Sequence, residues 1–151
     1  MDRTAQVRSV AVNDDAALAL EKAMQDGYVE MYGEPDQDPD NHISTALEVL
    51  VMSVEDQDVG VAAWGVWPDG DGKVKLIYLQ PEQRGKGLGS YLLSVIEHRM
   101  RMEGLTRVRF ETGPEQHAAQ KMYEAAGYRR TEAFGFYAEN EGSHFFTKEL
   151  R

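Results

Sequence analysis

The chain has 151 residues, 26 of them acidic and 16 basic, so it carries a net charge of −10 and has the length of a single domain, 1–151. Cysteine is absent, which excludes disulfides, a thiol nucleophile and cysteine-based zinc sites, and the four histidines lack metal-ligand spacing, so we expect no metal. The acidic balance argues against nucleic acid, and without an apolar run of ~20 residues or a signal peptide we expect no membrane partner and a cytoplasmic protein.

The first half of the sequence predicts one helix, one long loop and four strands. Ala16–Met24 is rich in helix formers and follows Asn13-Asp14-Asp15, which suits a helix N-cap. Segment 26–41 contains two prolines and many aspartates, and it is predicted to be a loop, at most with one helical turn. Strands are expected at 6–12, 48–54, 59–67 and 74–79, the middle two forming a hairpin.

The second half predicts two amphipathic helices between short strands. Apolar residues recur at helical spacing from Leu88 to Ile96 and again from Ala119 to Ala126. Gly104 and Gly127 end these helices in the manner of C′ glycines. Strands are expected at 107–111, 128–136 and 145–149. This order indicates an α+β, or mixed α/β, sheet domain.

A glycine-rich loop precedes the first of these two helices. Its sequence is Arg84-Gly85-Lys86-Gly87-Leu88-Gly89-Ser90. Helix N-termini expose unpaired N–H groups, and glycines let the backbone approach an anion, so such a loop can wrap a phosphate group. Arg84 and Lys86 add positive charge where a diphosphate would bind. The alternative is a solvated turn that starts a helix.

Two other nucleotide-binding motifs also contain glycine-rich loops. A Walker A motif is excluded because no Gly-Lys-Ser/Thr follows a four-residue spacer. A dinucleotide site of an oxidoreductase fragment stays open, since Gly85-x-Gly87-x-x-Ser90 nearly matches its fingerprint and Glu111 ends the next strand. Against it, five residues separate the strand from the glycines, and only about 40 residues remain for further βα units.

The loop resembles the R/Q-x-x-G-x-G/A motif of the GNAT N-acetyltransferases. Downstream, residues 116–128, QHAAQKMYEAAGY, resemble the family's second signature, N-x-x-A-x-x-L-Y-x-x-x-G-F. The resemblance implies a central mixed, mostly antiparallel sheet of six to seven strands flanked by about four helices. It also implies that the fourth and fifth strands splay apart to admit the pantetheine arm of acetyl-CoA.

The resemblance further implies the residues that bind acetyl-CoA. Backbone N–H groups of the glycine loop would hold the diphosphate, and the end of the preceding strand would pair with the pantetheine amides. The expected cofactor-binding residues are Tyr78, Leu79, Arg84, Gly85, Lys86, Gly87, Leu88, Gly89, Ser90, Gln116 and Tyr123. Gln116 replaces the family's usual Asn, and the strand before the loop offers Lys73 and Lys75 where many members carry a glutamate base.

Two residues are the candidates for proton transfer. Tyr123 matches the family's motif tyrosine and is the expected general acid, although its spacing also fits a core aromatic. Glu111 ends the strand next to the cofactor strand and is the candidate base, with a role in capping the following turn as the alternative. An aromatic and acidic acceptor pocket, suited to a cationic amine, is expected from Tyr28, Tyr32, Asp36, Phe134 and Tyr137, unless these residues only pack.

These inferences predict an acyl-CoA-dependent N-acetyltransferase. The acceptor would be a primary amine of a small molecule or peptide, and without cysteine the amine would attack directly in a ternary complex. The alternative is a non-catalytic acyl-CoA-binding regulatory module, which the lysines in place of a glutamate base make credible. A homodimer is expected because oligomers are common in the family.

Overall fold

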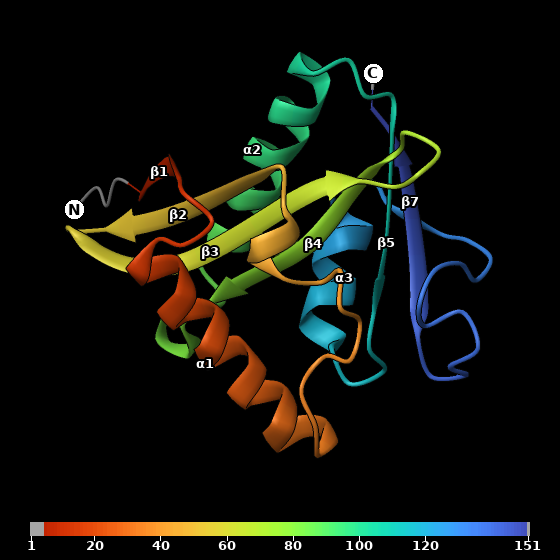
Figure 1. Ribbon diagram of the computed structural model, residues 1–151, viewed down its shortest axis with the longest axis horizontal. Coiled ribbons are helices and arrows are strands. Elements are labelled where there is room, and N and C mark those ends of the chain that lie inside the picture. The colour runs from red at the N-terminus through yellow and green to blue at the C-terminus, as the bar shows by residue number, and fades with distance from the viewer. Residues whose placement is uncertain (1–4, 151) are drawn as a thin grey trace.

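The computed structural model describes residues 5–150. Seven strands form one sheet, and their bounds are β1 Ala5–Val10, β2 Glu48–Val54, β3 Gln57–Val66, β4 Gly72–Leu79, β5 Arg107–Thr112, β6 Arg129–Arg130 and β7 His144–Glu149. Their order across the sheet is β1-β2-β3-β4-β5-β7-β6, as Figure 1 shows. All neighbouring strands are antiparallel except β4 and β5, which are parallel.

One face of the sheet is covered by helix α1, Asp15–Tyr32 (Figure 1). Its N-cap is Asp14, whose carboxylate accepts the backbone N–H of Ala17 at 3.1 Å. Ala17, Leu20 and Met24 recur at helical spacing and are buried against apolar residues of β2, β3 and β4. The same side of α1 continues beyond this core, where Tyr28 and Tyr32 line the cavity described below.

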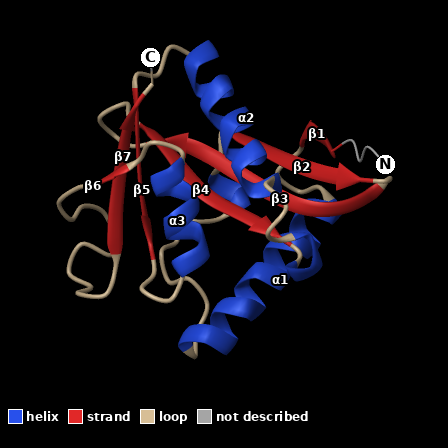
Figure 2. Ribbon diagram, turned by 180° about the vertical axis from the view of Figure 1, so that it is seen from behind, coloured by secondary structure: helices blue, strands red, loops and turns tan. Residues whose placement is uncertain are grey.

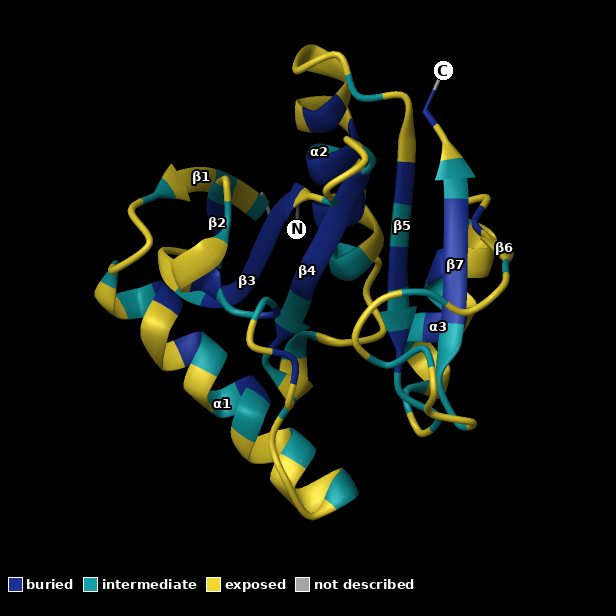
Figure 3. Cartoon of the chain, turned by 45° about the vertical axis from the view of Figure 1, so that its right-hand side comes forward, coloured by how far each residue is buried: buried dark blue, intermediate teal, exposed yellow. Residues whose placement is uncertain are grey.

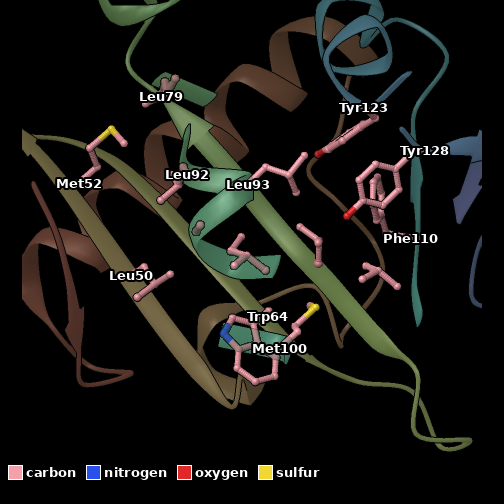
Figure 4. Packing of buried hydrophobic residues seen from close by; sticks show 14 of the residues in the cluster. Leu50, Met52, Trp64, Leu79, Leu92, Leu93, Met100, Phe110, Tyr123 and Tyr128 are labelled. Carbon is pink, nitrogen blue, oxygen red and sulfur yellow. The ribbon is translucent and has the colours of Figure 1, made fainter. Parts of the chain in front are cut away.

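The opposite face is covered by α2, Leu88–Met102, and α3, His117–Ala125 (Figure 2). Figure 4 shows this core, in which leucines of α2 pack on Leu50 and Trp64 of the sheet and Tyr123 of α3 packs beside Phe110 of β5. The buried colour in Figure 3 runs along the middle of β3, β4 and β7. The sheet is therefore enclosed by helices on both faces. None of the helices within residues 5–150 is both long and apolar enough to span a membrane.

The sheet parts between β4 and β5. These strands share a single register pair, Gly72 with Val108, near the start of each strand, and they diverge toward Leu79 and Thr112 (Figure 3). A bulge in the β3–β4 ladder, between Ala63 and Trp64, adds to the local twist. The splay expected between the fourth and fifth strands is therefore confirmed. It exposes the facing edges of β4 and β5 in the middle of the sheet.

Two predictions about the secondary structure are wrong. The segment 26–41 is helical as far as Tyr32, because the stripe of Met24 continues through Tyr28 and because Gly27 faces open space, where it disturbs no packing. The helix ends only at Gly33, whose φ of +83° is the left-handed conformation that terminates helices.

The predicted strand at 128–136 is the second error. Only Arg129–Arg130 pair with β7, and the chain then leaves the sheet as a loop. Phe134 contacts Trp67 at 5.2 Å between ring centroids, and Gly135 lies so close to the same indole that an added Cβ would be 2.9 Å from it. This packing pulls the segment off the sheet edge. Within residues 5–150 there are three α-helices and two short 3₁₀ turns, so the expected four helices are also wrong.

Candidate functional site

An open, glycine-rich backbone joins β4 to α2. Gly85 and Gly87 adopt φ values of +79° and +83°, and no atom lies within 4 Å of a Cβ added at either position. Helix α2 begins without a side-chain cap. In the described part of the chain, the N–H groups of Leu88, Gly89 and Ser90 have no hydrogen-bond partner. Unpaired N–H groups at the positive end of a helix dipole are suited to bind an anion.

The basic residues of the loop surround this helix start. Arg84 donates from Nε to the carbonyl oxygen of Leu79 at 3.0 Å, and its guanidinium lies 5.5 Å from the centroid of the Tyr78 ring. Lys86 is exposed between the two left-handed glycines. Gly89 lets α3 approach, because a Cβ there would lie 2.9 Å from the sulfur of Met122.

At the end of β4, the backbone N–H of Leu79 faces the gap between β4 and β5. The N–H of Gln80 donates to the carbonyl of Val59 in β3 at 2.9 Å. Because successive N–H groups of a strand point in opposite directions, the N–H of Leu79 faces away from β3, toward β5. The divergence of β5 leaves this edge of β4 without a ladder partner at Leu79.

Two adjoining cavities open beside this edge. The inner cavity lies between β4, β5 and α3, and Tyr123, Lys73 and Trp67 are among its lining residues. The outer cavity has a volume of about 340 Å³ and is lined by residues of α1, of the loop after it and of loop 134–143. The residues shared by both cavities are Tyr28, Asp36, Glu111 and Gln116. They mark the junction between the two spaces.

Glu111 of β5 lies at this junction with an unusual acidity. Burial raises the pKa of its carboxyl to about 8, the negative charges of Asp36 and Asp38 add to the rise, and Lys73 opposes it. The carboxyl therefore exchanges a proton near neutral pH. The expected alternative role, capping the turn at Thr112, has no hydrogen bond to support it within residues 5–150.

Tyr123 is both a core residue and a cavity residue. It is 6% exposed, and its ring packs on Phe110, Tyr128 and Phe146 with centroid distances of 4.3, 5.9 and 5.9 Å. Figure 4 shows its hydroxyl pointing out of this aromatic cluster, on the side of β4. Burial raises the pKa of this phenol, and the nearby charge of Glu111 raises it further, so the hydroxyl keeps its proton.

The structure brings together the five residues predicted to bind the acceptor. Tyr28 and Tyr32 lie one turn apart on α1, with ring centroids 6.2 Å apart, and both line the outer cavity. Asp36 accepts a hydrogen bond from the Tyr137 hydroxyl at 2.5 Å, which joins the loop after α1 to loop 134–143. Phe134 lines only the inner cavity.

The two lysines of β4 are paired rather than free. Lys73 donates to the carboxylate of Asp40 at 2.9 Å and lies 4.4 Å from the centroid of the Trp67 ring. Lys75 forms an ion pair with the same carboxylate at 2.8 Å and donates to the backbone carbonyl of Asp40 at 2.8 Å. The lysines were predicted from the sequence to lie on this strand, but their partner Asp40 was not. A usable signal was present, since two lysines inside a buried strand require carboxylates and segment 36–40 supplies them.

Gln116 occupies the junction from the side of α3. It is the N-cap residue of that helix, its side chain makes no capping hydrogen bond, and it lines both cavities. Gln116 is therefore, with Glu111, one of the residues at which the inner and outer cavities meet. Asp38, Asn41 and Trp67 also line the inner cavity and were not singled out from the sequence.

Fold and site together define a protein with an uncapped helix start, suited to an anion, next to an acidic, aromatic cavity in a parted sheet. The family model described as the acetyltransferase (GNAT) family matches residues 17–128, and the chain belongs to this family. This membership, with the largely antiparallel sheet, sets aside the oxidoreductase alternative.

Individual relatives match most of the chain. An IAA acetyltransferase of Azospirillum brasilense is 28% identical over 90% of this chain and 99% of its own length. The solved structure of a candidate acyl-CoA N-acyltransferase from Klebsiella pneumoniae is 30% identical with a TM-score of 0.82, covering 97% of this chain and 98% of that one. A GNAT acetyltransferase from Elizabethkingia anophelis with acetyl-CoA bound shares the fold at 14% identity and a TM-score of 0.73, covering 97% and 98% of the two chains.

Proposed function

We propose that this protein transfers the acetyl group of acetyl-CoA to a primary amine of a small molecule or peptide, by direct attack in a ternary complex. Family membership supports acetyl-CoA as the cosubstrate. The observation that carries the proposal is Glu111, a carboxyl with a pKa of about 8 at the junction of the two cavities. Such a group can take a proton from an ammonium ion near neutral pH.

The residues around the end of β4 fit the acyl donor. The open backbone from Gly85 to Ser90 suits the diphosphate, because no side chain crowds it and the helix start offers unpaired N–H groups. Arg84 and Lys86 contribute positive charge, and Tyr78, beside Arg84 at the end of β4, and Gln116, which lines both cavities, would contact the cofactor arm. The thioester supplies an activated carbonyl, and the N–H of Leu79 is oriented to donate to its oxygen as negative charge develops.

Glu111 and Tyr123 divide the proton transfers between them. Glu111 takes one proton from the acceptor's ammonium group, and the neutral nitrogen forms a bond to the acetyl carbon. The carbon–sulfur bond breaks, and the Tyr123 hydroxyl donates its proton to the departing sulfur. The nitrogen then loses its second proton to water, and water returns a proton to Tyr123. Glu111 finally releases its proton to solvent, which restores the base and accounts for both protons that the amine gives up.

The outer cavity favours a cationic acceptor. Its lining contains three acidic side chains, Glu34, Asp36 and the part-protonated Glu111, and no lysine or arginine among the described residues. Tyr28 and Tyr32 add aromatic surface, on which the apolar part of an amine or its charge can pack. Acidic acceptors would meet like charge here, so we expect amino compounds without a carboxylate to be preferred.

Two measurements test the proposal. Isothermal titration should give acetyl-CoA binding that Gly87→Asp abolishes, because this substitution adds a negative charge and strains a backbone position with φ of +83°. A CoA-release assay with 2-phenylethylamine, spermidine and glutamate should give turnover with the first two only. No acetyl-CoA binding refutes the proposal, and a preference for glutamate refutes the cationic pocket. Tight binding without CoA release from any amine establishes instead the alternative, a non-catalytic acyl-CoA-binding regulatory module.

A further inference from the structure

Asn41 lines the inner cavity, and one of its side-chain polar atoms has no hydrogen-bond partner within residues 5–150. The residue is 6% exposed, and its side-chain Nδ2 donates to Asp36 Oδ2 at 3.1 Å. Its backbone N–H donates to the carbonyl of Asp38 at 3.1 Å. The side-chain carbonyl, Oδ1, is buried and has no hydrogen-bond partner in residues 5–150.

The orientation of this amide is fixed by its neighbour. Turning the side chain over would place Oδ1 against the carboxylate of Asp36, and two acceptors in contact repel. Asp36 is itself held in place by the Tyr137 hydroxyl and by the backbone N–H of Asp38. A buried carbonyl without a donor is costly, so its presence in a cavity wall indicates that a ligand supplies the donor.

We propose that Asn41 Oδ1 accepts a hydrogen bond from the nucleophilic nitrogen of the acceptor and so orients it for attack. The inference rests on the proposed function, because the same cavity holds Glu111 and Tyr123. Once Glu111 has taken one proton from a primary ammonium, the nitrogen keeps two N–H bonds and a lone pair. One N–H donates to Asn41, and the lone pair is then free to meet the acetyl carbon.

This geometry makes Asn41 a specificity-determining residue. A hydroxyl nucleophile gives its single proton to Glu111 and has none left for Asn41, so the amide carbonyl stays unpaired. Sites built to pair with a donor reject analogues that lack it far more strongly than apolar pockets do. The protein should therefore favour amines over hydroxyl compounds of the same shape.

The test compares two cations that differ in N–H count. Isothermal titration at pH 8.5, where Glu111 with its pKa of about 8 is mostly deprotonated, measures the Kd of 2-phenylethylamine and of N,N-dimethyl-2-phenylethylamine, whose single N–H goes to Glu111. We expect the wild type to bind the primary amine about tenfold more tightly, the factor that ~1.4 kcal/mol produces. Asn41→Leu should reduce this ratio to about one, with the Kd for acetyl-CoA unchanged. Asn41→Ser, which preserves polarity in the loop but is too short to replace the carbonyl, should behave in the same way.

Gln25→Met is the matched control for a merely structural effect. Gln25 Oε1 accepts the backbone N–H of Asp36 at 2.8 Å, so it supports the same loop, yet it does not line either cavity. This variant should keep the tenfold ratio. An unchanged ratio in Asn41→Leu, an equal loss in Gln25→Met, or no binding of either amine overturns the inference. A ratio lost only in the Asn41 variants, together with no CoA release, supports Asn41 and refutes the transferase.

Discussion

At the residue scale, Glu111 combines burial with two neighbouring carboxylates. Its side chain points to the side of the sheet on which the loop after α1 places Asp36 and Asp38, and both raise its pKa. Lys73 would lower this pKa more effectively if it were free, but its charge is shared with Asp40. The site therefore keeps a carboxyl that is part protonated at neutral pH, which a strand-end glutamate exposed to water would not be.

The first prediction concerns the pH dependence of activity. As a base Glu111 works only when deprotonated, so kcat/KM for the acceptor should rise with pH and level off above a pKa of about 8. Asp36→Asn removes one of the charges that raise this pKa, and the profile should shift to lower pH. Initial rates at saturating acetyl-CoA, taken between pH 6 and 10, measure this pH profile for the wild type and the variant. A wild-type profile that is flat across pH 8 would exclude Glu111 as the base.

The same pKa has a consequence for stability. The folded state keeps the Glu111 proton between its ordinary pKa of 4.5 and about 8, whereas the unfolded state releases it. The stabilisation by the neutral carboxyl is thus complete below pH 4.5 and is lost as pH rises through 8, at no more than ~1.4 kcal/mol per pH unit for one proton. Glu111→Gln stays neutral at every pH. In urea denaturation, its free energy of unfolding should therefore rise relative to that of the wild type between pH 5 and 8. If the free energies of unfolding of the two proteins changed with pH in parallel, this prediction would be contradicted.

Tyr123 supports a second prediction at this scale. Tyr123→Phe removes only the hydroxyl, which lines the cavity, while the ring contacts with Phe110 and Phe146 remain. Turnover should fall by about 10²–10⁴-fold, the range for loss of a general acid, with little change in the Kd for acetyl-CoA. Steady-state kinetics and titration measure the two quantities separately. Unchanged turnover would leave Tyr123 as a core aromatic only.

At the scale of elements, the sequence patterns located the helices next to the candidate site but missed the extent of α1 and of the strand expected at 128–136. The glycine loop, α2 and the motif at 116–128, which contributes Gln116 and Tyr123 to the inner cavity, were located from local patterns, because anion-binding turns and amphipathic helices have short-range signals. The extent of α1 was missed, since tertiary burial of Met24 and Tyr28 overrides a local run of glycine and acidic residues. Asn41 was missed because its pairing with Asp36 follows from a loop conformation without a sequence pattern.

The splay between β4 and β5 yields a prediction with an internal control. The N–H of Gln80 is bonded to Val59, whereas the N–H of Leu79 faces the gap. Without acetyl-CoA, the Leu79 amide should therefore exchange with deuterium at least about tenfold faster than the Gln80 amide. Saturating acetyl-CoA should slow Leu79 and leave Gln80 nearly unchanged, as followed by NMR. Equal protection of both amides before acetyl-CoA is added would mean that Leu79 is not available to the cosubstrate.

At the scale of the whole molecule, charge is distributed unevenly along the chain. Residues 1–72 contain 16 acidic and 3 basic residues, and residues 73–151 contain 10 acidic and 13 basic ones. In the fold, the acidic half supplies α1 and the loop that lines the outer cavity, and the other half supplies the glycine loop and α2. A cationic acceptor would thus approach the acidic surface, and an anionic acyl donor would approach the basic one. This separation favours the ternary complex, because neither ligand is drawn to the other's entrance.

This arrangement predicts a salt effect on acceptor capture. Raising NaCl from ~0.1 to ~1 M shortens the Debye length from ~10 to ~3 Å, so kcat/KM for spermidine should fall several-fold while kcat changes little. Glu34→Gln removes an exposed carboxylate from the outer cavity and should weaken the salt dependence. Glu30→Gln is the matched control, since Glu30 is exposed on α1 but lines neither cavity. If both variants keep the wild-type slope, acceptor capture does not depend on the charge of this cavity, and the cation preference must come from Glu111 and Asp36 deeper inside.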